Sequence, residues 1–445
     1  MAASVFDSAL FSRLFPTGEV GRLFTDTAEL RAMLLVEGML AKVQGEQGMI
    51  PELSAAAISR AAMEVQLDPG ALAHATGQNG VSVPALVAAF RSEMQAPEHA
   101  QYAHWGATSQ DIIDTGLMLR LRQALGLIEK DIVAALDHLA QKAEDHADTP
   151  MPARTYGQHA TPTSFGAVVA SWGEPLLGLL GELPDLRRSC LLVSLSGAAG
   201  TASALGPQAA ETRAALAKLL NLTNPERSWH TDRTPVLRIA DWCSRIALAF
   251  GKMGEDATEL VQSGISELSL DGGGSSSTMP QKQNPVAPSV LVALSRQTSG
   301  LIPVLQGAAM HRHQRDGAAW FTEWMCLPQI ILGAASAAQT GLALSEGLAA
   351  NPEQMRTALD GSKDLIHAEA LSFALADHLS RPDAQAATKA LCKEAIEADV
   401  PLRTLVARDW PQLNTDVLFD PAHQMGQAPT AARTFAKQVR SAAKT

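Results

Sequence analysis

Three glycines and three serines run directly into a lysine and an asparagine in residues 272–285, which read GGGSSSTMPQKQNP. Glycine permits backbone conformations that other residues avoid, and serine hydroxyls and backbone amides can donate hydrogen bonds to carboxylate oxygens. Lys282 adds a compact positive charge. The segment therefore predicts a mobile loop that closes over an anion. The alternative is a flexible Gly/Ser linker, and the abrupt ending at residues 279–285 counts against it.

Four further polar clusters interrupt an otherwise apolar chain. Each has a simpler explanation, which is helix capping for the first, an ordinary loop for the second and a solvated turn for the other two. All four nevertheless lie at the ends of predicted helices, where a helix bundle can present them to one common anion pocket. They are residues 104–111 (HWGATSQD), 154–162 (RTYGQHATP), 229–233 (WHTDR) and 311–316 (HRHQRD).

Composition limits the classes of function. The chain has 445 residues, 46% of them hydrophobic and 18% charged, and can bury a large core in two or three domains. Its net charge of -11, with no block of lysine and arginine, argues against a nucleic-acid partner. An anionic substrate must therefore meet a local concentration of positive charge.

Cysteine usage and the N-terminal residues indicate a cytoplasmic protein. The four cysteines have no paired spacing, which favours buried reduced thiols over a zinc site or disulfides. Residues 1–14 contain Asp7 and Arg13 and resemble no signal peptide. The longest uncharged stretch, residues 189–210, is too polar for a membrane span, so no membrane partner is expected. The cysteines are Cys190, Cys243, Cys326 and Cys392.

The hydrophobic pattern predicts an all-α protein. After Asp111, leucine and isoleucine recur at intervals of four and three residues, which is typical of a helix packed lengthwise in a bundle. Four more long helical patterns follow, at residues 164–195, 235–269, 286–311 and 318–350. The periodic residues are Leu117, Leu121, Leu125, Ile128, Ile132, Leu136 and Leu139.

We expect three domains: an N-terminal helical domain at 1–105, a central long-helix bundle carrying the glycine-serine segment at 106–350, and a C-terminal helical domain at 351–445. Several long helices are apolar around much of their circumference, which predicts contacts between subunits. Pro175, Pro184, Pro303 and Pro328 are expected to kink or interrupt their helices.

The ending of the glycine-serine segment, SSTMPQKQNP at residues 276–285, resembles the signature of the fumarase/aspartase superfamily. Residues 104–111 are similar to that superfamily's Thr-Ser-x-Asp block, 154–162 to its Arg-Thr-x-x-Gln block, and 196–201 to its glycine-rich turn. The resemblance covers almost the whole chain. It implies a central bundle of five long helices, no cofactor, and a homotetramer whose active sites are shared between subunits.

Within the superfamily the chain resembles the cycloisomerase branch. Residues 77–87 lack the histidine of adenylosuccinate lyases, and Tyr156 stands where many lyases have a proton-transferring histidine. Ser275 departs from the usual glycine. The resemblance implies lactone closure of the tricarboxylate 3-carboxymuconate in protocatechuate (β-ketoadipate pathway) breakdown. Further similarity to this branch lies at residues 229–231, 320–324, 368–372 and 420–428.

The resemblance also implies roles for individual residues. Ser276 would donate the proton, and Lys282 and Asn284 would stabilise the negative charge that develops. With Tyr156 in place of the usual histidine, His159 is the nearest imidazole. Two alternatives stay open, a fumarate-releasing lyase of the adenylosuccinate lyase type and a catalytically silent structural member of the fold. The expected carboxylate ligands are Thr108, Ser109, Gln158 and Lys282, with Arg154, His230, Arg233 and Arg315 as weaker candidates.

Overall fold

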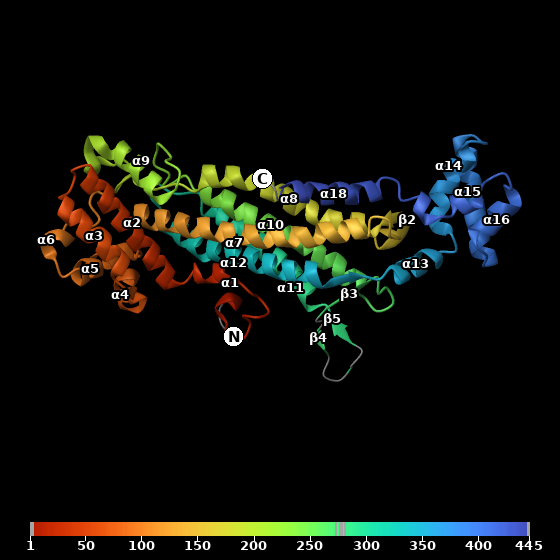
Figure 1. Cartoon of the computed structure of the whole chain (residues 1–445), viewed down its shortest axis with the longest axis horizontal. Helices are drawn as coiled ribbons and strands as arrows, with labels where there is room; N and C mark the ends of the chain where they lie inside the picture. The colour runs from red at the N-terminus through yellow and green to blue at the C-terminus, as the bar shows by residue number, and fades with distance from the viewer. Residues whose placement is uncertain (1–3, 272–273, 276–278, 280–281, 443–445) are drawn as a thin grey trace. The chain divides into compact units, whose positions relative to one another are not determined.

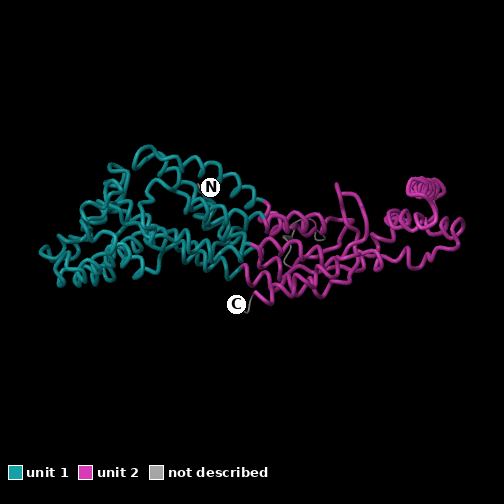
Figure 2. Tube along the Cα trace, turned by 90° about the horizontal axis from the view of Figure 1, so that it is seen from above, with its two compact units in different colours: residues 1–131, 179–248, 293–340 teal, residues 132–178, 249–292, 341–445 magenta. Residues whose placement is uncertain are grey.

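Helices make up nearly all of the regular structure in the computed structural model, which describes residues 4–271, 274, 275, 279 and 282–442. The all-α prediction is confirmed. The chain divides into two compact units (Figure 2): unit 1 is residues 1–131, 179–248 and 293–340, and unit 2 is residues 132–178, 249–292 and 341–445. These units are a different kind of division from the expected domains with boundaries near 105 and 350, and the three-domain division stays a prediction.

Each of the five long helices that the hydrophobic pattern predicts is present in the described part of the chain. The first, α7, has 37 residues, and every leucine and isoleucine of its predicted apolar series is buried. Pro175, Pro184, Pro303 and Pro328 all lie inside continuous helices, so none of them interrupts its helix. The five are α7 (Ser109–Asp145), α8 (Phe165–Cys190), α10 (Thr234–Leu260), α11 (Val286–Gly307) and α12 (Gly317–Gly347).

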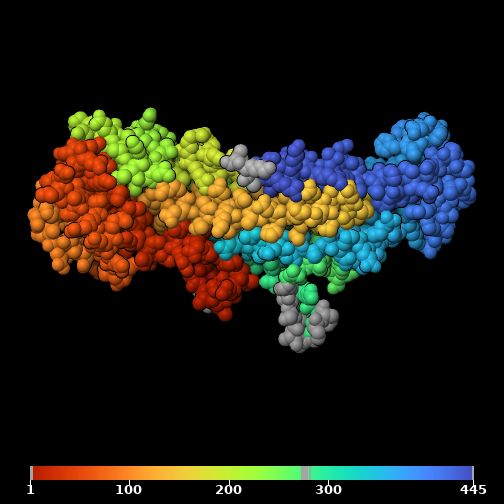
Figure 3. All heavy atoms as spheres, viewed as in Figure 1, coloured from red at the N-terminus to blue at the C-terminus, as the bar shows by residue number. Residues whose placement is uncertain are grey.

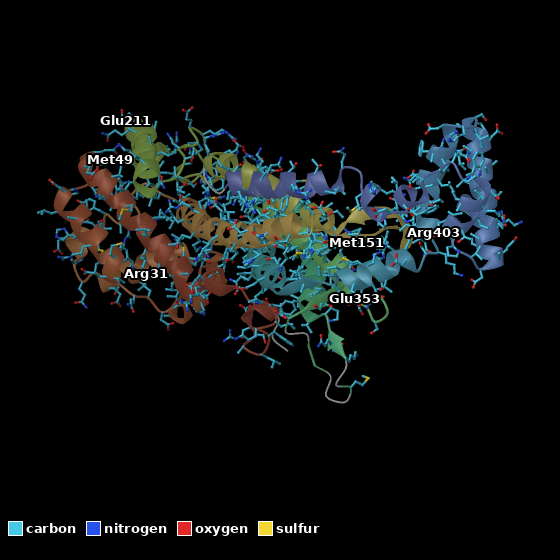
Figure 4. The ribbon with its side chains drawn as sticks, turned by 45° about the vertical axis from the view of Figure 1, so that its right-hand side comes forward. Arg31, Met49, Met151, Glu211, Glu353 and Arg403 are labelled. Carbon is cyan, nitrogen blue, oxygen red and sulfur yellow. The ribbon has the colours of Figure 1, made fainter. Side chains whose placement is uncertain are left out.

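In unit 1, α2 and α3 lie side by side (Figure 1). Glycine allows this close approach, since a Cβ on Gly38 would lie 2.6 Å from the Cβ of Ala62. Arg31 of α2 (Figure 4) donates hydrogen bonds at the C-terminal end of α3, to the carbonyls of Met63 and of the capping residue Val65, both at 2.9 Å. The shorter helices are α1 (Gly18–Arg22), α2 (Asp26–Glu46), α3 (Glu52–Glu64), α4 (Pro69–Asn79), α5 (Val83–Glu93), α6 (Pro97–Ala100) and α9 (Ala209–Leu220).

An apolar cluster of unit 1 joins several of these helices to the start of α7. Phe90, Ile58 and Ile112 are fully buried in it, and Trp320 of α12 also contributes. The cluster therefore fixes the first turn of α7. Short 3₁₀ helices complete the regular structure: η1 (Val5–Asp7) and η2 (Ser203–Gln208) in unit 1, and η3 (Leu365–His367) and η4 (Pro421–His423) in unit 2.

Among its described residues, unit 2 contains three two-stranded antiparallel sheets and a separate C-terminal core. Arg403 (Figure 4) pairs with Asp364 through two hydrogen bonds of 2.6 and 2.7 Å beside this core, in which Leu371 and Leu402 are fully buried. The helices are α13 (Pro352–Asp360), α14 (Ala368–Ala376), α15 (Arg381–Ala398), α16 (Leu402–Asp409), α17 (Thr415–Leu418) and α18 (Ala428–Ala442). The paired strands are β1 (Pro150–Thr155) with β2 (Gln158–Ser164), β3 (Leu268–Leu270) with β6 (Leu348–Ala350), and β4 (Gly274–Ser275) with β5 (Gln283–Asn284).

Residues 154–162, expected as a loop before a helix, lie in the β1–β2 hairpin. Tyr156 and Gly157 form its two-residue turn with φ angles of 53° and 73°. Two successive positive φ angles are typical of the type I′ turn, whose twist matches that of paired strands. The side chain of Tyr156 is fully exposed at the tip.

Helix α12 is long and apolar enough to cross a membrane by length and composition alone, and among the described residues it is the single such helix. In its most apolar window 72% of the residues are buried within the protein, as in the core helix of a soluble protein. All four cysteines are unpaired, as their spacing predicts, and three of them are buried.

Candidate functional site

The N-terminus of α7 carries Thr108 and Ser109 at a first turn that Asp111 holds in place. The N–H of Thr108 donates to Oδ2 of Asp111 at 3.0 Å, and the N–H of Asp111 donates to the carbonyl of Thr108 at 3.0 Å. This reciprocal pair satisfies backbone groups that a helix start otherwise leaves free. Thr108 and Ser109 are half-buried, so this helix terminus is accessible to an anion.

Asp111 is also the point at which three segments of unit 1 meet. Its fully buried carboxylate accepts hydrogen bonds from the hydroxyl of Ser194 and from the amides of Ser196 and Gly197, at 2.8 to 3.0 Å. His230 donates the remaining bond. Burial alone raises the pKa of Asp111, but the bonds from His230 and from these amides outweigh burial and leave the pKa below its ordinary value.

The imidazole of His230 is buried against Asp111. Its Nε2 lies 2.8 Å from Oδ1 of Asp111, and its backbone carbonyl accepts a hydrogen bond of 2.8 Å from Gln110. Its Nδ1 is buried and has no hydrogen-bond partner within the part of the chain that the structure describes. The carboxylate therefore fixes the orientation of the ring, with Nε2 toward Asp111.

Arg315 places a half-exposed positive charge beside the start of α7. Its guanidinium donates to Oε1 of Gln110 at 2.9 Å, to Oγ1 of Thr108 at 3.3 Å and to the carbonyl of Ala198 at 3.4 Å. These partners are uncharged, so they leave the positive charge uncompensated. Thr108, Ser109 and Arg315 are thus brought together in unit 1, in an arrangement suited to a carboxylate.

Arg233, also a candidate ligand, is enclosed by carboxylates. It donates two hydrogen bonds to Asp114, at 2.9 and 3.0 Å, and two to Glu323, at 2.7 and 2.8 Å. All three side chains are at most 2% exposed, and the guanidinium lies 4.9 Å from the ring centre of Trp229. Burial lowers the pKa of Arg233, but the two carboxylates raise it above the ordinary value. These contacts hold the guanidinium inside the protein.

His104 begins the same polar cluster and pairs with a buried glutamate. Its Nδ1 lies 2.6 Å from Oε1 of Glu37 on α2, whose side chain is fully buried. Burial lowers the pKa of His104, whereas the hydrogen bond and the charge of Glu37 raise it. Together the contributions that raise the pKa outweigh burial, so the net shift is upward. His104 is therefore held closer to its cationic form near the start of α7.

In unit 2, the β1–β2 hairpin carries Arg154, Gln158 and His159. Arg154 donates to both carboxylate oxygens of Glu267, at 2.7 and 2.8 Å, and the Glu267 side chain is fully buried. Gln158 and His159 are exposed near the turn. Burial and the charge of Arg154 lower the pKa of His159, and Glu267 opposes this in part. His159 is therefore closer to a neutral imidazole.

The signature segment is only partly described. Ser276 lies outside the described residues. Lys282 is exposed, and Asn284 lies in β5 opposite Gly274 of β4, a short hairpin that stands away from the helices of unit 2 (Figures 1 and 3). A pocket of about 280 Å³ at its base is lined by Ser263, Ser266, Gln283, Asn284 and Asn351, among others.

No group of three or more histidine, cysteine, aspartate or glutamate side chains in the described part of the chain is arranged to hold a metal ion.

The expected site residues fall into two sets, one in each unit. Unit 1 contains Thr108, Ser109, His230, Arg233 and Arg315, and unit 2 contains Arg154, Gln158, His159, Lys282 and Asn284.

Sequence reasoning missed the acidic partners of these residues. Asp114 and Glu267 lie outside the blocks singled out in the sequence, and Glu323 lies inside the block at residues 320–324 but was given no role. One signal was present for Asp114, because it lies three residues after Asp111 and thus shares a face of α7 with it. For Glu267 and Glu323 the pairing depends on tertiary packing and has no local signal.

Comparison with known proteins adds three findings. The model of the lyase family matches residues 16–300. A 3-carboxy-cis,cis-muconate cycloisomerase from Pseudomonas aeruginosa is 38% identical over 94% of both chains. The crystal structure of 3-carboxy-cis,cis-muconate lactonizing enzyme from Pseudomonas putida is similar with a TM-score of 0.91 and 35% identity, over 98% of this chain and 99% of that one.

One similar protein has a different reaction in its name. Nitrosuccinate lyase from Streptomyces davaonensis is 34% identical over 96% of this chain and 94% of its own length. The chain thus spans nearly the full length of proteins that differ in reaction, and the cycloisomerases from Pseudomonas aeruginosa and Pseudomonas putida match it with higher identities of 38% and 37%.

Proposed function

The chain belongs to the lyase family within the fumarase/aspartase superfamily, and from this membership we propose that it interconverts 3-carboxy-cis,cis-muconate and 4-carboxymuconolactone. The observation that carries the proposal is the full-length similarity to cycloisomerases in both sequence and structure. The protein would act in the cytoplasm, in protocatechuate breakdown through the β-ketoadipate pathway.

We assign substrate binding to side chains that are half-exposed or exposed. Thr108, Ser109 and Arg315 would hold one carboxylate at the start of α7, where the helix terminus and the guanidinium both favour negative charge. Gln158 and Lys282 are exposed and available for other carboxylates. A tricarboxylate needs such local binding groups, since the chain as a whole carries a net charge of -11.

The remaining candidates would support the binding site from within the protein. Arg233 is bonded to two buried carboxylates, Arg154 is bonded to Glu267, and His230 is bonded to Asp111. Removing any of them from its partner would leave a buried charge or polar group uncompensated. We therefore assign them to fixing the positions of the residues that face the substrate.

The reaction joins two parts of one molecule. A carboxylate oxygen of the substrate adds to a carbon of its own double bond, and the electron pair of that bond moves to the neighbouring carbon beside a second carboxylate. The resulting aci-carboxylate is stabilised by Lys282, Asn284 and loop amides, each worth about 3 kcal/mol in comparable sites. Ser276 then donates a proton to that carbon, and it removes the same proton in reverse. We assign the return of the serine proton to His159, the imidazole closest in the sequence to Tyr156.

We also propose a homotetramer in which neighbouring subunits complete each active site. Large apolar side chains on the long helices are exposed in the single chain, among them Met325 at 63%, Leu248 at 48% and Val304 at 48%. Exposed apolar residues on a bundle helix favour contact with another helix. Tyr156, fully exposed on its hairpin, would likewise lie against a second subunit.

A lyase that releases an unsaturated product is the second candidate, and the similarity to nitrosuccinate lyase favours it. An ultraviolet assay of the conjugated diene of 3-carboxymuconate separates the two. We expect the absorbance to fall with wild-type protein and to fall at least 100-fold more slowly with Ser276→Ala, given the size of general acid-base effects.

Two results would change this conclusion. Release of fumarate from adenylosuccinate or argininosuccinate, without loss of the muconate diene, would establish the lyase instead. Absence of turnover with all of these substrates would favour the catalytically silent member. Wild-type rates in a correctly assembled Ser276→Ala variant would overturn the assignment of the proton donor alone.

A further inference from the structure

Glu267 is a fully buried carboxylate to which the proposed reaction gives no chemical step. Both of its oxygens accept hydrogen bonds from Arg154, at 2.7 and 2.8 Å, and the Arg154 side chain is 21% exposed. A buried carboxylate is costly unless it is paired with good geometry. Two parallel hydrogen bonds to a planar guanidinium provide such geometry, so the pair fixes both direction and distance.

The backbone of Glu267 is anchored on both sides and leads into the signature segment. Its N–H donates to the carbonyl of Leu260 at 2.9 Å, and its carbonyl accepts from the N–H of Asn351 at 2.9 Å. Strand β3 follows immediately, and Asp271 alone separates it from residues 272–285. Its neighbours Ser266 and Leu268 line the pocket that also contains Asn284. Glu267 thus lies between two residues that form the wall of this pocket, just before the proposed catalytic segment begins.

Arg154 connects this wall to the β1–β2 hairpin. It is the penultimate residue of β1, and it lies opposite His159 of β2 in the strand pairing. The adjacent pair, Thr155 and Gln158, directly precedes the exposed turn. A fixed Arg154 therefore fixes the end of the hairpin that carries Gln158 and His159.

We infer that Glu267 is a positioning residue, which acts through Arg154 to hold Gln158 and His159 at a set distance from the pocket beside Asn284. This inference rests on the proposed function. It also gives Arg154 a different role from that of a substrate ligand, because two of its guanidinium nitrogens already donate to Glu267.

A double-mutant cycle tests the inference. Glu267→Gln and Arg154→Gln are each expected to lower kcat/KM by about 100-fold, the effect of a misplacement of about 1 Å. The double variant should be no slower than the slower single variant, because both changes break one link. The matched control is Glu129→Gln, which breaks another paired arginine contact, with Arg187 at 2.6 and 3.3 Å, and should leave kcat/KM unchanged.

The same variants distinguish positioning from direct binding. If Arg154 bound the substrate itself, Arg154→Gln would be far slower than Glu267→Gln, and the inference would be wrong. Wild-type kcat/KM in Glu267→Gln would overturn it equally. If Glu267→Gln does not fold, Glu267→Asp keeps the charge and shortens the reach, and it is expected to lose activity while retaining helical content.

Two measurements do not depend on turnover. Amide hydrogen exchange in residues 150–164 should be faster in Glu267→Gln than in wild type or Glu129→Gln. The pKa of His159, followed by NMR of labelled histidine, should fall in Glu267→Gln and rise in Arg154→Gln, since Glu267 raises it and Arg154 lowers it. If the wild-type protein does not turn over 3-carboxymuconate, the proposed function is wrong. If amide exchange and the pKa of His159 are the same in Glu267→Gln as in wild type, the positioning role is wrong.

Discussion

Nε2 of His230 lies 2.8 Å from Oδ1 of Asp111, and both side chains are buried at the start of α7. The carboxylate simultaneously holds the amides of Ser196 and Gly197 and that of Thr108. One aspartate thereby joins the start of a long helix, a glycine-rich turn and the segment before α10. The positions of Thr108 and its neighbours depend on this single group.

Asp111→Asn should reduce stability by about 3 to 5 kcal/mol, the usual effect of breaking a buried charged pair. Because the pKa of Asp111 is lowered in the folded protein, its stabilisation is present above the unfolded value near 3.9 and is lost as pH falls through the folded value. Urea unfolding of both proteins at several pH values checks this. A difference that does not shrink on acidification would contradict it.

Arg233→Met should be among the most destabilising single substitutions in unit 1. It leaves Asp114 and Glu323 buried without their shared cation, and we expect a loss of about 3 to 5 kcal/mol. Equilibrium unfolding in urea measures the loss. A change below about 1 kcal/mol, the value typical of exposed ion pairs, would show that the pair is solvated.

Arg315→Gln should weaken catalysis without weakening the fold. Its guanidinium is half-exposed and contacts neutral groups, so stability should change by less than about 1 kcal/mol. Loss of the proposed contact between Arg315 and a substrate carboxylate should lower kcat/KM by about 100-fold, mainly through a higher KM. Arg238→Gln, at a partly exposed arginine on α10, is the control and should retain wild-type kinetics.

Glu37→Gln should lower the pKa of His104, since the glutamate supplies both the hydrogen bond and the nearest charge that raise it. The sign of the stability effect follows. A raised folded pKa stabilises the protein below the unfolded value near 6.5, and this contribution disappears as pH rises through the folded pKa. Thermal unfolding at pH 5 and pH 9 should therefore show a larger difference between wild type and variant at pH 5.

The five long helices were predictable because each has a sustained apolar period, as in the series from Leu117 to Leu139. The β1–β2 hairpin was missed, since its prolines and polar residues lack strand alternation and its turn has Tyr156 rather than the usual asparagine or aspartate. The pairing of Arg233 and Arg154 with buried acids could not be predicted from the sequence either. Whether an arginine faces solvent or a buried acid depends on distant segments, here those of Glu323 and Glu267.

The turn at Tyr156 and Gly157 has an evolutionary consequence. A tyrosine with positive φ is strained by about 1 kcal/mol relative to glycine or asparagine, and its exposed ring gains no packing in return within its own chain. Selection for folding alone would replace it. Tyr156 is therefore a position where folding of the single chain and assembly of the proposed tetramer favour different residues, and Tyr156→Asn should give a more stable hairpin and a weaker tetramer.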